Sequence, residues 1–204
     1  MIKKNIILIG SGGHAISCID VIESGQLYEI AGLVGMPEEL NTWVSGYPIL
    51  GTDDKLFELA KSFRCAHISI GQIKNPDIKI NCFNYALGMG FELPPIISPL
   101  AYVSPNASVG SGTIVMHGAI VNAGATIGHN CIINSNSLIE HGVSIGNHCH
   151  ISTATVLNGD VSVDDEVFIG SGTLVKQGLK IGKRSVIGIG SIVTKNINFG
   201  NYSI

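Results

Sequence analysis

Histidine is concentrated in the second half of this chain, and His141 is notable because it follows an acidic residue in the segment "NSLIEHGVSIG". Imidazole gains and loses its proton near neutral pH, so a histidine beside a cleft is a candidate general base. By the repeat described below, Ile139 points inward, Glu140 therefore points outward, and His141 falls at or near a corner. Gly159 follows eighteen residues later, so in a β-helix with three strands per coil it would lie over His141, without a side chain that could block a ligand.

The chain around these residues is a six-residue repeat. From Val103 to Val193, every sixth residue is aliphatic, without an insertion, and the residue four positions later is usually small. An α-helix of 3.6 residues per turn would spread this repeat around its circumference, whereas short strands joined by turns keep one aliphatic side chain per strand pointing inward. Residues 103–204 are therefore predicted to form a parallel β-helix, whose coils bury their aliphatic layers by stacking on one another.

The first 93 residues show a different pattern, in which apolar strands alternate with amphipathic helices. Strands are predicted within residues 5–10, 28–35 and 65–71, and helices within residues 11–25, 53–63 and 75–90. This alternation is typical of a small parallel, Rossmann-like α/β domain, which we assign to residues 1–93. Several prolines crowd the stretch that follows, so residues 94–102 are expected to be a linker or a first irregular rung.

The turn between the first predicted strand and helix, "GSGGH", contains Gly12, Gly13 and His14. Backbone N–H groups and the helix dipole at such a turn can hold a phosphate. The third glycine of the G-x-G-x-x-G motif is missing, and a tight turn would also select glycine, so nucleotide binding and a plain turn fit this motif equally well. Glu38 and Glu39 follow the second strand, but not where a strand tip would place a ribose-binding carboxylate.

The composition favours small molecules and copies of the same chain as partners. Twelve Lys and Arg against fifteen Asp and Glu give a net charge of −3, and no basic run indicates a nucleic-acid surface. The mean hydropathy of +0.38 suggests an extended core and a buried subunit interface. No stretch reaches the ~20 apolar residues that span a bilayer, so we expect no membrane insertion. Five scattered cysteines without a C-x-x-C pair fit reduced thiols in the cytoplasm.

Histidine is also a zinc ligand, which makes metal chemistry an alternative. In a β-helix with three faces, a spacing of twelve residues would place His117, His129 and His141 on three different faces, so these side chains could not converge within one chain. We therefore expect no metal site, and we expect His117, His129 and His148 to be solvated corner residues. Zinc hydration chemistry would instead require stoichiometric metal in the purified protein.

The GSGGH start, the small α/β domain, the proline-rich bridge and the repeat containing "NSNSLIEHGVSIGNHCHIS" resemble the NeuD/PglD-like sugar O-acyltransferase family. That family covers sialic acid O-acetyltransferases and enzymes that N-acetylate nucleotide-linked 4-amino sugars. The resemblance extends over nearly the whole chain. It implies a left-handed β-helix of triangular section, a homotrimer with active sites in the grooves between prisms, and acetyl-CoA as the co-substrate without a metal.

The resemblance also implies roles for individual residues, with His141 matching the general base. The cofactor-binding positions are His150, Gly159, Ser171 and Ile189. The nucleotide-sugar pocket corresponds to Gly12, Gly13, His14 and Gly71. Relatives often carry Asp or Glu directly after the base, whereas this chain has Gly142, so Glu140 or a neighbouring subunit is expected to orient His141.

The implied reaction is acetyl transfer to a sugar. An amine loses a proton as it attacks the thioester carbonyl, neutral His141 accepts that proton, and backbone N–H groups stabilise the oxyanion. We expect the acceptor to be the 4-amino group of a nucleotide sugar used for surface polysaccharide. O-acetylation of a sialic-acid-type sugar is the alternative with the same chemistry, and a non-catalytic trimeric ligand-binding relative is a second alternative. The acidic pair that holds the base in UDP-sugar relatives is absent from "LVGM", so UDP, GDP and dTDP all stay open.

Overall fold

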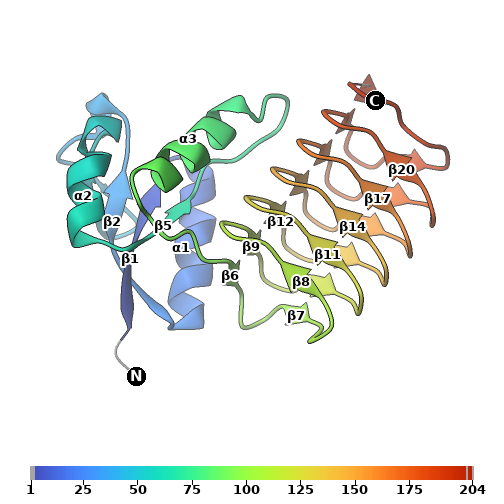
Figure 1. Cartoon of the computed structure of the whole chain (residues 1–204), viewed down its shortest axis with the longest axis horizontal. Helices are drawn as coiled ribbons and strands as arrows, with labels where there is room; N and C mark the ends of the chain where they lie inside the picture. The colour runs from blue at the N-terminus through green and yellow to red at the C-terminus, as the bar shows by residue number, and fades with distance from the viewer. Residues whose placement is uncertain (1–2, 201, 204) are drawn as a thin grey trace.

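The computed structural model, coloured along the chain in Figure 1, describes residues 3–200 and the backbone of residues 202 and 203. The N-terminal part is a sheet in the order β3-β4-β2-β1-β5. Its strands are β1 (Lys4–Ile9), β2 (Tyr28–Val34), β3 (Trp43–Val44), β4 (Tyr47–Gly51) and β5 (Cys65–Ile68). Its helices are α1 (Gly13–Gly25), α2 (Leu56–Ser62) and α3 (Asp77–Gly88), with short 3-10 turns η1 (Pro37–Glu39) and η2 (Asp53–Lys55). Residues 1–2, 201 and 204 of the expected domains lie outside the described residues.

The predicted parallel α/β domain is confirmed, with β1, β2, β4 and β5 paired in parallel. Alternation along β1 explains why helices cover both sides of the sheet. Ile6 and Leu8 belong to a buried cluster with α1, whereas Ile7 and Ile9 belong to a cluster with α2 and α3. A continuous apolar run is typical of a parallel strand that is buried on both faces.

β3 and β4 form an antiparallel hairpin that the sequence does not predict. Its turn residues, Ser45 and Gly46, have φ of 48° and 87°, the left-handed conformation that a two-residue hairpin turn requires. β3 has two residues, which is too short to show the alternation by which a strand is recognised.

The second part of the chain is a parallel β-helix, as predicted. Its two-residue strands stack in three parallel sheets, and each strand pairs with the strand one coil later, as Ile120 does with Leu138. From residue 103 to residue 193, the second residue of each strand points inward, and Val121, Ile133 and Ile151 are completely buried. Burying one such side chain contributes roughly 1.5–3 kcal/mol, so the aliphatic repeat stabilises every coil of the prism.

The three faces of the prism have different outward side chains. The docking face contains β6 (Ile96–Ile97), β9 (Ile114–Val115), β12 (Ile132–Ile133), β15 (His150–Ile151), β18 (Phe168–Ile169), β21 (Val186–Ile187) and β23 (Tyr202–Ser203). The apolar face contains β7 (Tyr102–Val103), β10 (Ile120–Val121), β13 (Leu138–Ile139), β16 (Val156–Leu157), β19 (Leu174–Val175) and β22 (Ile192–Val193). The polar face contains β8 (Ser108–Val109), β11 (Thr126–Ile127), β14 (Ser144–Ile145), β17 (Ser162–Val163) and β20 (Lys180–Ile181). From β6 to β22, the first residue of each strand points outward and sets the character of its face.

The N-terminal domain packs on the first coils of the docking face (Figure 1). α1 buries its apolar side against Ile114 and Ile132 in one cluster. From α3, Lys79 donates a hydrogen bond from Nζ to the carbonyl of Asn130 at 2.8 Å. The segment 94–102, expected to be a linker or a first irregular rung, contains β6, which pairs with β9 and so takes part in the first coil.

Two histidines that were expected to be solvated instead join the two domains. His117 contacts Asp20 of α1, with 2.9 Å between Nε2 and Oδ2. His148 packs edge-on against Phe83 of α3, with 5.5 Å between the ring centroids. His129 is exposed, as expected. The periodicity of the prism does not reveal such contacts, because they depend on the helices of the other domain.

Candidate active site

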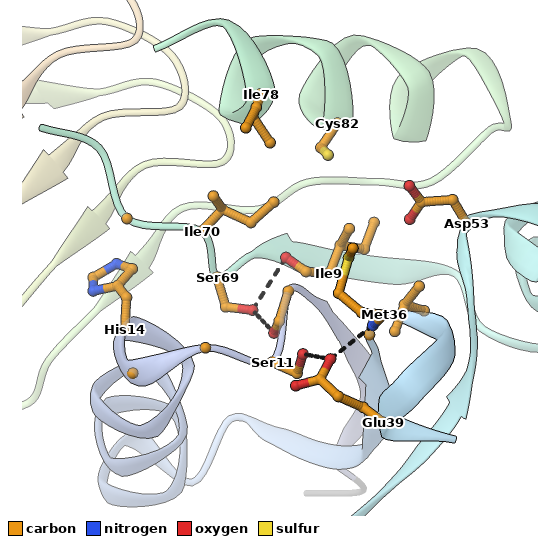
Figure 2. A pocket seen from close by; sticks show the side chains of 16 residues that line it. Ile9, Ser11, His14, Met36, Glu39, Asp53, Ser69, Ile70, Ile78 and Cys82 are labelled. Atoms are coloured by element: carbon orange, nitrogen blue, oxygen red, sulfur yellow. Dashed lines mark hydrogen bonds between the residues drawn. The ribbon is translucent and has the colours of Figure 1, made fainter. Parts of the chain in front are cut away.

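A cavity of about 540 Å³ opens at the carboxyl ends of β1 and β2 (Figure 2). Parallel α/β sheets bind ligands at this edge. The cavity is lined by residues 9–14, 34–36 and 69–71, with Glu39, Asp53, Ile78 and Cys82. The residues predicted for the nucleotide-sugar pocket, Gly12, Gly13, His14 and Gly71, all line this one cavity. We call it the nucleotide cavity.

The loop before α1 has the local structure of an anion site. Gly10 has φ of 110° and approaches Ile70 so closely that a Cβ would lie 2.6 Å from Ile70 Cγ1. Gly12 is the N-cap of α1, and a Cβ there or at Gly13 would meet nothing within 4 Å. The first N–H groups of a helix have no intrahelical partner, so they can bind a phosphate above this open loop. Burial lowers the pKa of His14 to about 4, which keeps its ring neutral.

Glu39 belongs to the nucleotide cavity, although the sequence does not indicate it. The 3-10 turn η1 folds the side chain back, so Oε2 accepts hydrogen bonds from Ser11 Oγ at 2.5 Å and from Met36 N at 2.7 Å. These bonds lower the pKa of the Glu39 carboxyl. Proline at the first turn position and glutamate two residues later are the local signal that could have predicted this fold-back. Asp53, from η2, is a second carboxylate of this cavity.

A second cavity, of about 600 Å³, lies at the corner where the docking face turns into the apolar face. We call it the cofactor cavity. It is lined by Ile73, Lys74, His150, Ser152, Phe168, Ser171 and residues 186–189. Three of the predicted cofactor-binding residues, His150, Ser171 and Ile189, therefore share one cavity, and the fourth, Gly159, lies elsewhere.

His150 is held in a single orientation and protonation state. Its Nδ1 lies 2.6 Å from the carbonyl oxygen of Gln72, which can only accept, so Nδ1 carries the hydrogen. Its Nε2 accepts a hydrogen bond from Asn134 Nδ2 at 3.2 Å. The ring packs edge-on against Phe168, and burial lowers the pKa of His150 to about 4. His150 is therefore a neutral, oriented group in the wall of the cofactor cavity.

His141 lies in the turn that joins the apolar face to the polar face. Its side chain is 70% exposed, and Nδ1 is 3.4 Å from Glu140 Oε2. Burial opposes ionisation of Glu140, but hydrogen bonds from His141 and from Asn122 Nδ2 (3.1 Å) lower the pKa of this carboxyl. A proton on Nδ1 that is shared with Glu140 leaves Nε2 as the free acceptor.

Gly159 lies over His141, as the repeat predicts. A Cβ at this position would be 2.6 Å from His141 Nε2, so glycine leaves the free nitrogen accessible. Gly142 occupies a corner position with φ of 68°, and Asn136 and His148 have the same left-handed conformation one repeat before and after it. A corner of this kind favours glycine for a backbone reason, whichever group orients the base.

One chain does not bring His141 and the cofactor cavity together. His141 follows β13 at the corner between the apolar and polar faces, whereas Ser152, Ser171 and Ile189 follow strands of the docking face at its corner with the apolar face. The two groups therefore lie at opposite edges of the apolar face. Within residues 3–200, no cluster of three or more His, Cys, Asp or Glu side chains is placed to hold a metal ion. In the same range, no helix is long and apolar enough to cross a membrane.

Family models match the chain in three parts. Residues 5–85 match the PglD N-terminal domain, residues 94–177 match the GMPPB C-terminal domain, and residues 160–195 match the hexapeptide repeat of succinyl-transferase. No curated protein matches the sequence significantly.

Solved structures match the chain almost from end to end. A mutant of perosamine N-acetyltransferase from Caulobacter crescentus, in complex with CoA and GDP-perosamine, is 30% identical with a TM-score of 0.91, over 97% of this chain and 92% of that chain. The acetyltransferase domain of PglB from Neisseria gonorrhoeae, in complex with acetyl coenzyme A, is 27% identical with a TM-score of 0.89, over 98% and 95%. WeeI from Acinetobacter baumannii, at 19% identity and a TM-score of 0.85 over 98% and 96%, shares the fold. The α/β domain, the left-handed hexapeptide β-helix and these matches show that the chain belongs to the PglD-like family of sugar acetyltransferases.

Proposed function

We propose that this protein transfers the acetyl group of acetyl-CoA to the 4-amino group of a nucleotide-linked amino sugar used in surface polysaccharide or glycan biosynthesis. The observation that carries the proposal is the pair of cavities, one at a glycine loop and one at a neutral histidine, in a chain similar over 97% of its length to an enzyme solved with CoA and GDP-perosamine. Free cysteines fit a reducing cytoplasm as the place of the reaction.

The nucleotide cavity suits the nucleotide sugar. The diphosphate would lie on the loop of Gly12 and Gly13, where the N-terminus of α1 favours negative charge. Glu39 and Asp53 would accept hydrogen bonds from the nucleoside. The sugar would then extend past His14 towards the prism, since His14 stands at the side of the cavity that faces the β-helix in Figure 2. Gly71 lies beside it, because a Cβ at Gly71 would be 3.6 Å from His14 Cβ.

The cofactor cavity suits acetyl-CoA. Its walls are mainly apolar, through Ile73, Phe168 and Ile189, as the pantetheine arm requires. Lys74 adds a positive charge that would face the phosphates of coenzyme A. His150 would contact the acyl end, because its neutral ring and fixed tautomer define where a donor or acceptor of the cofactor can bind.

The proposed reaction follows from the orientation of His141, whose Nδ1 faces Glu140 and whose Nε2 is free. Nε2 accepts a proton from the sugar amine as the nitrogen attacks the thioester carbonyl, and Glu140 stabilises the resulting imidazolium. The tetrahedral intermediate then collapses, the carbon–sulfur bond breaks, and the thiolate of coenzyme A takes up the proton. The products are the acetylated amine and free coenzyme A, without a covalent enzyme intermediate.

The apolar face supports assembly into a trimer. Its outward row consists of Tyr102, Ile120, Leu138, Val156, Leu174 and Ile192. The corresponding row of the polar face consists of Ser108, Thr126, Ser144, Ser162 and Lys180. Ile192 is 73% exposed in the single chain, and a continuous apolar stripe of this kind marks an interaction surface.

A head-to-tail ring would complete the active site. In such a ring, one edge of the apolar face meets the opposite edge on the next copy. His141 of one chain would then stand beside the cofactor cavity of its neighbour, although the two are apart in one chain. Mixed trimers of His141→Ala and His150→Phe chains should therefore recover up to about one quarter of the wild-type activity, the share of sites that receive both intact groups. If the mixed trimers recover no activity, the His141 and His150 of one active site would have to come from the same chain.

The direct test of function is thiol release from acetyl-CoA with UDP-, GDP- and dTDP-4-amino sugars and with free sialic acid as acceptors. We expect turnover with one nucleotide amino sugar, and a decrease of roughly 100-fold or more in His141→Ala. Turnover only with sialic acid would identify a sugar O-acetyltransferase. Binding of acetyl-CoA without turnover on any acceptor would favour a non-catalytic binding protein.

A further inference from the structure

The segment 69–74, which follows β5, lies in the wall of both cavities. Ile70 and Gly71 line the nucleotide cavity. Ile73 and Lys74 line the cofactor cavity. Gln72 stands between the two pairs and is 3% exposed. The two proposed binding sites are therefore separated by the width of this one segment.

The start of the segment is attached to the glycine loop of the nucleotide cavity. Ser69 Oγ donates hydrogen bonds to the carbonyl of Gly10 at 2.6 Å and to that of Ile9 at 3.2 Å. These bonds, drawn in Figure 2, place the segment directly against the loop that would hold the diphosphate. A shift of the segment would therefore change the shape of the nucleotide cavity.

The middle of the segment is attached to the prism by His150. The hydrogen bond from His150 Nδ1 to the carbonyl of Gln72, at 2.6 Å, joins residues that are 78 positions apart in the sequence. In the part of the chain that the structure describes, residues 70–74 make no other hydrogen bond to the prism. Because His150 and Ile73 both line the cofactor cavity, a ligand there would contact one end of this bond and the residue next to the other end.

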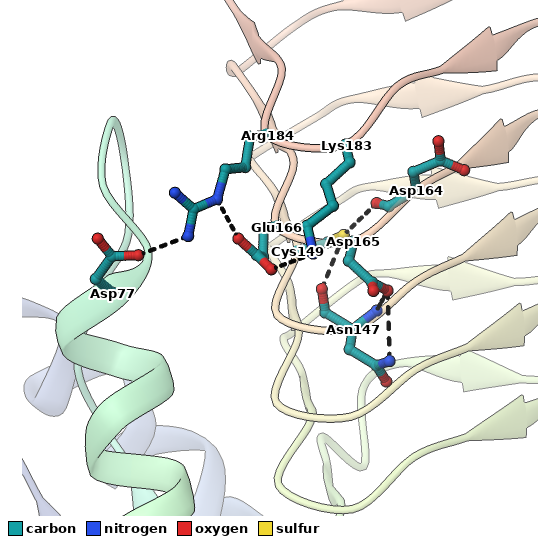
Figure 3. Close-up of polar contacts among 8 residues, drawn as sticks. All are labelled: Asp77, Asn147, Cys149, Asp164, Asp165, Glu166, Lys183 and Arg184. Carbon is teal, nitrogen blue, oxygen red and sulfur yellow. Dashed lines mark hydrogen bonds and ion pairs between the residues drawn. The ribbon is translucent and has the colours of Figure 1, made fainter. Parts of the chain in front are cut away.

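α3 continues the shared wall beyond the segment. Ile78 and Cys82 line the nucleotide cavity, whereas Lys79 contacts the prism at Asn130. At the start of α3, Asp77 forms an ion pair of 2.9 Å with Arg184 of the prism, and Arg184 is also paired with Glu166 (Figure 3). The segment is thus held at its start by Ser69 and beyond its end by α3.

We propose that segment 69–74 couples the two sites, and that His150, through Gln72, is a positioning residue for the nucleotide cavity as well as a wall of the cofactor cavity. This inference rests on the proposed function. A ligand that packs against Ile73, Lys74 and His150 favours the arrangement of the segment in which Gly71 and Ile70 close the nucleotide cavity. Linkage makes the effect reciprocal, so nucleotide and cofactor strengthen the binding of each other by the same factor.

Calorimetric titration of the full-length wild type tests the coupling without turnover. The dissociation constant of a nucleoside diphosphate, whichever of UDP, GDP and dTDP binds, is measured with and without saturating coenzyme A. We expect it to fall about fivefold or more with coenzyme A, and the constant of coenzyme A to fall by the same factor with the diphosphate. Binding of both ligands with unchanged constants would overturn the coupling and leave the proposed enzyme intact. Failure of both ligands to bind would overturn the two proposals together.

Two variants test the part played by His150. His150→Phe keeps an aromatic ring beside Phe168 but removes the bond to Gln72, so we expect the coupling factor to fall below about twofold. Asn134→Ala removes the hydrogen bond at Nε2 and leaves the bond to Gln72, so it should keep the coupling. If His150→Phe no longer binds coenzyme A, its affinity for the diphosphate alone should be several-fold weaker than that of the wild type. An unchanged affinity for the diphosphate would show that His150 does not position the nucleotide cavity.

Discussion

Replacing Gly159 by alanine tests whether His141 works in the position that the structure gives it. A Cβ at residue 159 would lie 2.6 Å from Nε2 and 2.7 Å from Cε1 of His141. Ordinary contacts of this kind are about 3.5–4.0 Å, so the two groups must separate by about 1 Å. The His141 side chain is 70% exposed, and its ring can therefore turn outward at little cost in stability.

The expected result is a loss of rate without a loss of fold. A displacement of about 1 Å in a reacting group costs on the order of 100-fold in rate. We expect Gly159→Ala to lower kcat/KM by about 100-fold, near the effect of His141→Ala, and to change the free energy of unfolding by about 0.5 kcal/mol or less. Thiol release measures the first quantity and denaturant unfolding measures the second.

A matched substitution and a double variant separate the possible causes. A Cβ at Gly25, the last residue of α1, would meet nothing within 4 Å, so Gly25→Ala should keep full activity. The double variant of His141→Ala and Gly159→Ala should be no slower than His141→Ala alone, because both changes remove the same proton acceptor. Wild-type activity in Gly159→Ala would refute the assigned position of the ring. A further loss in the double variant would show that Gly159 acts independently of His141.

Two further predictions concern acid stability and the nucleotide cavity. The free energy of unfolding should fall as pH drops from about 6.5 towards 4, because burial lowers the pKa of His14 and His150 to about 4 and of His67 to about 3, so the unfolded chain binds protons that the folded chain does not. Each of these histidines contributes up to roughly 1.4 kcal/mol of stability per pH unit. In thermal melts, the stability of His67→Leu should therefore fall less steeply with decreasing pH than that of the wild type. Equal pH dependence in the two proteins would contradict the role of buried His67. Glu39→Gln should raise the KM of the nucleotide sugar about tenfold, by weakening charge-assisted hydrogen bonds, and should leave the KM of acetyl-CoA unchanged. Steady-state kinetics with each substrate varied in turn measure the two KM values. An equal rise in the KM of the nucleotide sugar and of acetyl-CoA would instead indicate that the substitution disturbs the structure as a whole.

The repeat in the sequence was sufficient to predict a parallel β-helix, and the family resemblance supplied its triangular section. An aliphatic residue at every sixth position specifies which side chain of each strand points inward, so the positions of Ile139, Glu140 and His141 follow from counting. The overlap of Gly159 with His141 follows in the same way, because strands stack in register. Alternating strands and helices likewise predicted the α/β domain, except for the short β3–β4 hairpin.

Counting along the sequence could not predict contacts that join different parts of the chain. Glu39 enters the nucleotide cavity because a 3-10 turn reverses its direction, and His150 reaches Gln72 because the N-terminal domain docks on one face of the prism. Periodicity reports which side chains are buried within one element, since each coil repeats the environment of the last. Docking between two domains has no period, because it depends on which side chains of two unrelated surfaces meet. The sequence therefore determined the β-helix, the α/β domain and the exposed position of His141. Only the tertiary structure decided which face of the prism the N-terminal domain covers and how two cavities come to share one wall.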